Sequence, residues 1–137
     1  MVMRANRNQR TAGFTLIELM IVISMILILV SVSIPAYNQS ILRAKESVLK
    51  QNLFQLRSLI SRYTLDKQKA PQGLDDLVSS GYIKQLPVDP MTGNNSSWTV
   101  EQEEDTISSP DQRDSGISDV HSGSTATSTD GTAYNTW

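Results

Sequence analysis

The feature that most constrains this chain is an uncharged stretch from Leu19 to Leu42, which is predominantly apolar as far as Ile34. At 1.5 Å per residue, residues 14–34 would form a helix of roughly 31 Å, enough to cross the hydrocarbon core of a bilayer. An ordinary secretory signal is the alternative, because small residues suited to its cleavage site follow: Ser31, Ser33 and Ala36. The apolar region of such a signal is only about 7–15 residues long. We therefore predict that residues 14–35 form a transmembrane helix.

Charged residues are divided unevenly between the two sides of this stretch. Residues 1–13 contain three basic residues and no acidic residue: Arg4, Arg7 and Arg10. The rest of the chain has nine basic and fourteen acidic residues. Because basic residues hold their side of a membrane segment in the cytoplasm, we expect a cytoplasmic N-terminus and an acidic remainder across the membrane. The acidic remainder has no basic patch that would suggest nucleic-acid binding.

Glu18 is the one carboxylate at the head of the apolar run. A charged side chain there costs several kcal/mol unless a partner neutralises it, which makes Glu18 a candidate functional residue. If the chain were cleaved after Gly13, the new α-amino group of Phe14 would lie four residues away. In a bundle of parallel helices offset by one turn, a neighbour's amino group would then meet this carboxylate. We predict that Glu18 sets the register of assembled subunits; the alternative is a tolerated acid at the membrane surface.

Helical periodicity continues beyond the membrane segment. Pro35 removes one backbone donor, and we expect it to bend the helix rather than to end it. Over residues 36–69, apolar residues recur at helical spacing and predict one buried face: Leu42, Leu49, Leu53, Leu56, Ile60 and Tyr63. We assign the charged residues to the other faces: Arg43, Lys45, Glu46, Lys50, Arg57 and Arg62. The helix is thus expected to reach about Lys67 and to serve as the spine of a soluble head.

Residues 70–137 are expected to form that head, after a break at Ala70-Pro71-Gln72-Gly73. Leu74–Val78 predicts a short helix with Gly81 as its C-cap. Residues 98–102 and 116–121 alternate like half-buried strands. Tyr134 and Trp137 are expected to anchor the end of the chain under the head. Such a small core usually needs a staple, and the chain has no cysteine, so only a metal or assembly is left.

No motif of enzymatic chemistry stands out in the chain. Asp119, His121 and Ser122 are the residue types of a hydrolase triad, but neighbours on a strand point to opposite faces. The acids near position 103 are most simply a solvated edge and loop: Glu101, Glu103, Glu104 and Asp105. We therefore predict no catalytic residues and no enzyme.

Two stretches resemble a known family. Gly13-Phe14-Thr15-Leu16-Ile17-Glu18-Leu19 resembles the class III signal of type IV pilins and pseudopilins. Pro35 matches the usual helix proline, and we predict that Pro35, together with Glu18, serves assembly. The segment from Gln72 to Pro90 resembles the major pseudopilin of type II secretion, as does the terminal Trp137. The resemblance implies an α+β, pilin-like fold: a long helical spine and a small head made of a short helix and an antiparallel sheet. It also implies that a leader of residues 1–13 is cleaved between Gly13 and Phe14, and that Phe14 is N-methylated.

The resemblance further implies a calcium ion in the loop before the C-terminus, in place of a disulfide. In this chain Asp130 is the only carboxylate of that loop. Weaker oxygen donors accompany it: Ser124, Thr125 and Ser128. Calcium typically takes 6–8 oxygen ligands with carboxylates among them, so the alternative is an ordinary polar surface loop.

By the same resemblance, the chain would polymerise with other pseudopilins into a periplasmic filament that drives folded proteins through an outer-membrane secretin. The implied partners are an inner-membrane prepilin peptidase, the secretion platform proteins and a separate cytoplasmic ATPase. Before assembly the subunit would be a single-pass inner-membrane protein. The alternatives are a type IV pilin or minor pilin that builds a surface fibre, and a signal-anchored periplasmic enzyme or binding domain.

Overall fold

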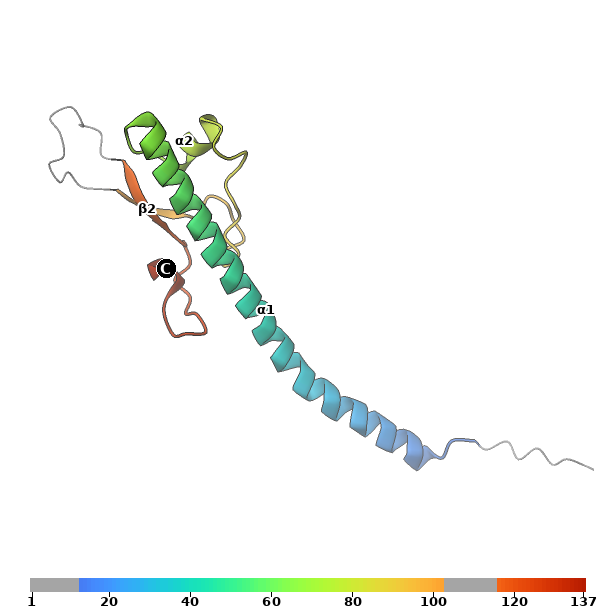
Figure 1. The fold of residues 1–137 in the computed structure, drawn as a ribbon. Helices are drawn as coiled ribbons and strands as arrows, with labels where there is room; N and C mark the ends of the chain where they lie inside the picture. The colour runs from blue at the N-terminus through green and yellow to red at the C-terminus, as the bar shows by residue number, and fades with distance from the viewer. Residues whose placement is uncertain (1–12, 103–115) are drawn as a thin grey trace, which may run out of the picture. The chain divides into compact units, whose positions relative to one another are not determined.

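The computed structural model describes residues 13–102 and 116–137. Its elements, in order, are helix α1 (Leu16–Lys67), helix α2 (Leu74–Ser79), strand β1 (Thr99–Gln102), strand β2 (Ile117–His121) and the 3-10 helix η1 (Tyr134–Thr136) (Figure 1). The predicted α+β, pilin-like class is confirmed by this composition. The leader before Gly13 and the acids at 103–105 lie outside the described residues.

Two compact units divide the chain, one up to Gln39 and one from Ser40 to Trp137. The first unit contains the apolar part of α1, in which the large hydrophobic side chains from Phe14 to Ile34 are exposed. Within the described ranges, α1 is the one helix long and apolar enough to cross a membrane. Pro35 lies inside α1, and the helix continues past it as predicted.

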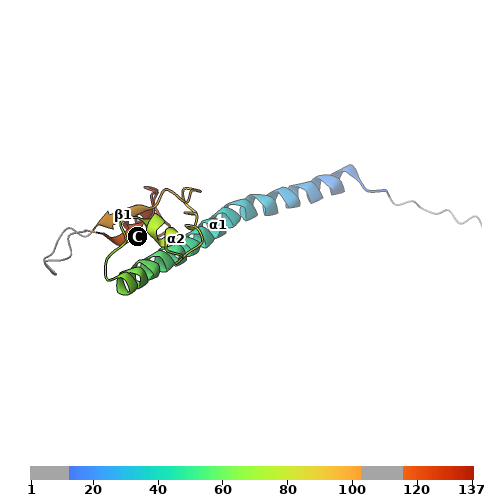
Figure 2. The same cartoon turned by 90° about the horizontal axis from the view of Figure 1, so that it is seen from above.

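The core of the second unit forms along the C-terminal half of α1 (Figures 1 and 2). Five of the six predicted stripe residues are buried, and Leu42 is half-buried. Residues of α2, β2 and η1 pack against this stripe: Leu74, Leu77, Ile117, Val120 and Tyr134. Trp98, from the loop before β1, joins them. Each fully buried aliphatic side chain of this kind contributes about 1.5–3 kcal/mol. The predicted role of the amphipathic half as a spine is therefore confirmed.

Glu46 corrects the sequence interpretation. The sequence pattern predicts a polar outer face for Glu46, but this residue is only 6% exposed. The reason is geometric: steps of four, three and four residues join Leu42, Glu46, Leu49 and Leu53, which places all four on one helix face. Glu46 therefore fills the gap that the apolar pattern leaves between Leu42 and Leu49.

Helix α2 ends in a turn at Gly81, as its sequence predicts. Gly81 has a φ of 79°, in the left-handed region. The N–H of Tyr82 donates to Leu77 O at 3.0 Å, and the N–H of Gly81 donates to Val78 O at 3.1 Å. These two bonds define a Schellman motif. The motif satisfies two free carbonyls of α2 and turns the chain so that Tyr82 packs against the core.

Strands β1 and β2 pair antiparallel, with Val100 opposite Val120 and Glu101 opposite Asp119. Each strand begins one residue later than the alternation predicted. The register shifts between Glu101 and Gln102, and an irregularity of this kind reorients side chains. Ile117 and Val120 are both buried although they are three residues apart.

The end of the chain returns to α1, as predicted for its aromatic residues. Tyr134 is fully buried and Trp137 is partly buried against the core. Their rings meet edge to face with centroids 5.1 Å apart, an arrangement that stabilises aromatic pairs.

One glycine of this segment is required by close packing. A Cβ atom on Gly123 would lie 2.0 Å from the carbonyl oxygen of Ser97. The backbone of residue 123 can therefore approach the loop before β1 only without a side chain.

We predict that Gly123→Ala lowers the free energy of unfolding by about 1–3 kcal/mol, because the added methyl group must displace backbone atoms. Gly73→Ala is the matched control, since a Cβ there meets no heavy atom closer than 3.9 Å. Urea unfolding of the full-length protein in detergent micelles measures both variants. Equal stabilities of the two variants would contradict the packing argument.

Candidate functional site

The start of α1 is built by a cap that the sequence interpretation missed. Thr15 Oγ1 accepts a hydrogen bond from the N–H of Glu18 at 3.2 Å, and Thr15 O accepts one from the N–H of Leu19 at 3.2 Å. Thr15-x-x-Glu18 has the spacing of a capping box, and that spacing was the signal available. A carboxylate in the first turn is also favoured by the helix dipole. Glu18 therefore lies at a defined helix start.

Phe14 lies just before this cap and is 85% exposed. Gly13 also precedes the helix, so the predicted cleavage point lies in non-helical chain. Processing at Gly13–Phe14, N-methylation of Phe14 and the assembly roles of Glu18 and Pro35 remain predictions.

The head contains a buried carboxylate that binds the terminal loop. Glu46 Oε1 accepts hydrogen bonds from the N–H of Thr129 at 2.7 Å and from the hydroxyl of Tyr134 at 2.8 Å. Glu46 Oε2 accepts one from the hydroxyl of Thr129 at 2.7 Å. Burial alone would raise the pKa of Glu46, but the Thr129 and Tyr134 bonds and the charge of Lys50 outweigh it and lower this pKa. Burial and the Glu46 contact raise the pKa of Tyr134 to about 12.

A second cluster joins the sheet to α1. Arg57 Nε donates to Asp119 Oδ1 at 2.6 Å, and its Nη2 donates to the main-chain oxygens of Val120 and Trp137 at 3.0 and 2.9 Å. Burial raises the pKa of Asp119, but the Val120 N–H and Arg57 outweigh it, so the pKa lies below its ordinary value. The sequence pattern predicts an outer face for Arg57; its half-exposed side chain contacts two segments of the head, β2 and the last residue of the chain.

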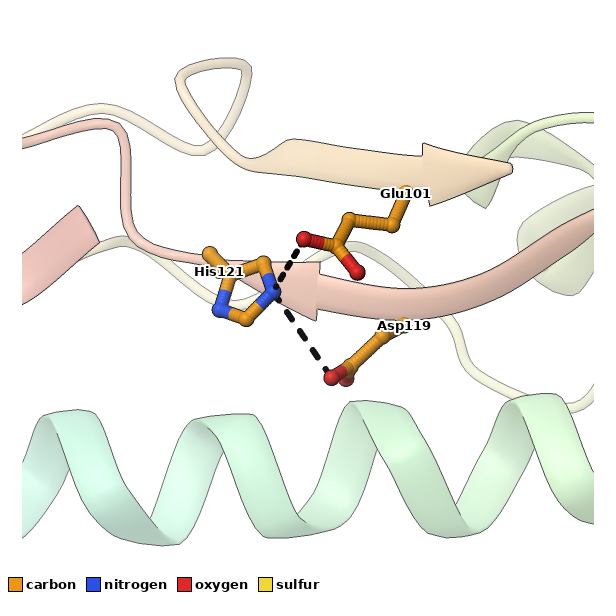
Figure 3. Close-up of side chains that lie close together, drawn as sticks. All are labelled: Glu101, Asp119 and His121. Atoms are coloured by element: carbon orange, nitrogen blue, oxygen red, sulfur yellow. Dashed lines mark ion pairs between the residues drawn. The ribbon is translucent and has the colours of Figure 1, made fainter. Parts of the chain in front are cut away.

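Figure 3 shows that His121 turns its Nε2 toward the carboxylates of Glu101 and Asp119. Its Nε2 is 3.3 Å from Glu101 Oε1 and 3.6 Å from Asp119 Oδ2, while its Nδ1 contacts the main-chain oxygen of Trp137. Like charges directly opposite on paired strands are destabilising, and the guanidinium of Arg57, 2.6 Å from Asp119 Oδ1, offsets the repulsion between Glu101 and Asp119. The side chain of Glu101 is 65% exposed, which agrees with the solvated edge expected from the sequence.

Glu101, Asp119 and His121 offer ligand atoms within 4.8 Å of one another. Among the described residues, this group comes nearest to a set of metal ligands. The guanidinium of Arg57 lies 2.6 Å from one of the carboxylates. A fixed positive charge at that distance opposes a second cation. The arrangement therefore fits an ion-pair cluster better than a metal centre.

The structure does not assemble a hydrolase triad from Asp119, His121 and Ser122. Asp119 and His121 share a strand face, as residues two apart do. The Ser122 hydroxyl points elsewhere and donates to Asp89 Oδ2 at 2.5 Å in a fully buried contact. Asp89 Oδ1 accepts the N–H of Met91 at 2.8 Å. This pair ties the loop after Pro87 to the end of β2.

Asp130, the predicted calcium ligand, occupies a tight turn. The N–H of Gly131 donates to Ser128 O at 3.1 Å, and the N–H of Ser128 donates to Thr132 O at 2.7 Å. Ser-x-Asp-Gly is typical of such turns. The Asp130 N–H bonds to Ser128 Oγ at 3.2 Å, and the Asp130 side chain is exposed. Toward α1 the turn presents N–H and O–H donors of Thr129, whereas calcium needs acceptors. The residues present therefore do not fit a calcium site.

Comparisons with known proteins agree with the N-terminal resemblance. Residues 8–34 match the family model described as the prokaryotic N-terminal methylation motif. This match covers the start of α1, with Phe14, Thr15 and Glu18. No solved structure matches the chain.

Similarity to curated proteins extends beyond this motif. The type II secretion system core protein G of Aeromonas hydrophila is 33% identical over 100 residues, which cover 61% of this chain and 70% of that protein. Its counterpart in Escherichia coli K12 is 35% identical over 104 residues, covering 64% and 70%. The type IV major fimbrial protein FimA of Dichelobacter nodosus is 43% identical over 60 residues, covering 44% and 38%. By its processing motif, its helical spine and this extended similarity, the chain belongs to the family of the type II secretion system core protein G.

Proposed function

We propose that this chain is a structural subunit of the type II secretion pseudopilus, which polymerises into a periplasmic filament and drives export of folded proteins through the outer membrane. The observation that carries the proposal is the length of the similarity. The matches to core protein G extend over about 100 residues and 70% of those proteins, whereas the methylation motif covers only residues 8–34. The shared region therefore includes chain beyond the motif common to pilin-like proteins.

The two units suit storage in a membrane followed by assembly. The exposed apolar residues of the first unit suit a single-pass inner-membrane anchor, because the hydrocarbon of a bilayer would cover apolar side chains that the rest of the unit leaves exposed. We further propose that the basic leader holds the N-terminus in the cytoplasm and that the head, residues 70–137, is periplasmic. The partners would be a prepilin peptidase, other pseudopilins, the secretion platform proteins and the secretin.

Assembly would use the amino group of a processed Phe14 and the carboxylate of Glu18. Each charge is costly in lipid by itself, and pairing between neighbouring subunits would neutralise both. Filament growth would then be driven by a separate cytoplasmic ATPase. The curated relatives are named as secretion and fimbrial proteins, which supports a structural role rather than catalysis.

The second candidate is a type IV pilin or minor pilin. FimA of Dichelobacter nodosus supports it by identity, but the match covers only 38% of that protein. A signal-anchored periplasmic enzyme or binding domain would not need cleavage before Phe14. An intact N-terminus in protein purified from membranes would favour this third reading and contradict the other two.

We predict that deletion of the gene leaves normally exported proteins in the periplasm while surface fibres persist. Fractionation and activity assays of the exported proteins, with electron microscopy of the cells, measure the two outcomes. Complementation with the wild-type chain is the control. Loss of fibres with normal secretion would establish the pilin alternative instead.

We predict that Glu18→Gln is inserted and processed like the wild type but forms few or no filaments. Glutamine keeps the size of the side chain and the Thr15-x-x-Gln capping pattern, while the charge that would pair with a neighbour is lost. Mass spectrometry of the N-terminus reports processing and methylation, and sedimentation of sheared filaments reports assembly.

The matched control for this prediction is Thr15→Val, which removes the cap hydroxyl and keeps the carboxylate. We expect at most a modest loss of filaments, since a cap contributes about 0.5–2 kcal/mol. If Thr15→Val abolished assembly and Glu18→Gln did not, Glu18 would act through the helix start and not through charge pairing.

A further inference from the structure

Helix α1 holds the terminal loop of the head through Glu46 and Lys50, and Arg57 donates to the main-chain oxygen of its last residue, Trp137. All three hydrogen bonds to the Glu46 carboxylate come from residues more than 80 positions later, Thr129 and Tyr134. Hydrogen bonds to a carboxylate are roughly twice as strong as neutral ones. Lys50 lies one helical turn further on, and its Nζ stands 4.6 Å from the ring centroid of Trp137. The helix thus holds both ends of the segment Thr129–Trp137.

The geometry of the turn complements an anion. Thr129 is the first central residue of the Ser128–Gly131 turn, and both its N–H and its hydroxyl point to Glu46. Tyr134 adds a third donor from a fully buried position. Donors that converge on one point stabilise a negative charge and repel a cation.

Two of the three hydroxyl groups expected as weak calcium ligands, those of Ser124 and Ser128, accept hydrogen bonds within the loop. Ser128 Oγ lies 3.1 Å from Thr132 Oγ1 and also accepts the N–H of Asp130. Ser124 Oγ accepts the N–H of Ala126 at 3.3 Å. Asp130 remains as the one loop carboxylate, and it is exposed.

We propose that Glu46 is an anionic clamp that closes the head in place of a metal ion, so that this head folds without calcium. A calcium ion would place a positive charge at the centre of the loop and bind its acceptor groups. Here the charge is negative, because the carboxylate of Glu46 accepts hydrogen bonds from donors of the loop. The clamp also supplies the staple that a small cysteine-free head needs. Its consequence for filament assembly, independence from periplasmic calcium, rests on the function proposed above.

The first test measures the thermal unfolding midpoint of the purified full-length protein in detergent micelles, by near-ultraviolet circular dichroism. We expect the wild-type midpoint to be the same within about 1 °C in excess EGTA and in millimolar calcium. We expect Glu46→Gln to lower it by about 5–10 °C in both buffers, because the charge that strengthens all three hydrogen bonds is lost and the new NH2 group would face the Thr129 hydroxyl. Asp130→Asn, the matched loop control, should leave the midpoint unchanged.

The second test uses pH and does not require a stable Glu46 variant. Because the pKa of Glu46 is lowered on folding, its contribution is complete above its ordinary pKa of 4.5 and is lost as the pH falls through the lower folded value. Lys50, Thr129 and Tyr134 are the groups that face Glu46. Tyr134→Phe removes one donor and should reduce the loss of stability between about pH 5 and pH 3.

Two results would overturn the proposal. One is a calcium-dependent rise of several degrees in the wild-type midpoint that Asp130→Asn removes, since it would place a cation in the loop. The other is equal midpoints for the wild type and Glu46→Gln in EGTA. Both assays read folding of the head and not secretion, so failure of the proposed secretion role in the deletion experiment would leave this result standing.

Discussion

Helix α1 imposes the central constraint, because one continuous element has to satisfy two different environments. From Phe14 to Ile34 its large side chains are exposed and apolar on all sides, and only lipid or other helices can cover them. From Glu46 to Tyr63 a single stripe is buried by the head. The head in turn has no core without that stripe, since its own short helix and two strands supply few large apolar residues. Everything in the second unit is therefore organised along this half of the helix.

Three buried or half-buried carboxylates then hold loops that apolar packing alone would leave free. Glu46 binds the terminal turn, Asp89 binds Ser122, and Asp119 binds Arg57. Each carboxylate receives at least two hydrogen bonds, and this satisfies a charge that would otherwise be costly to bury. In a head without cysteine, these contacts join segments far apart in the chain, as disulfides do in small secreted domains.

Sequence patterns located the helices, the strands and the aromatic anchors within one or two residues, because each has a local physical cause. The sequence pattern fails at Glu46, because a charged residue at a stripe position is expected to face solvent unless its partner is known. The partner of Glu46 lies 83 residues away at Thr129. Asp130 has an exposed side chain, and its main-chain N–H takes part in the turn by donating to Ser128 Oγ.

Because charge, apolar length and period act locally along the chain, the amino-acid sequence alone indicates a membrane-length helix that continues as an amphipathic spine. The residues around Phe14 and the extent of the similarity to core protein G also establish the family. The contacts that close the head are visible only in the folded chain. Whether a buried carboxylate meets donors or a metal depends on which segments converge on it, and that convergence is set by packing between distant parts of the chain.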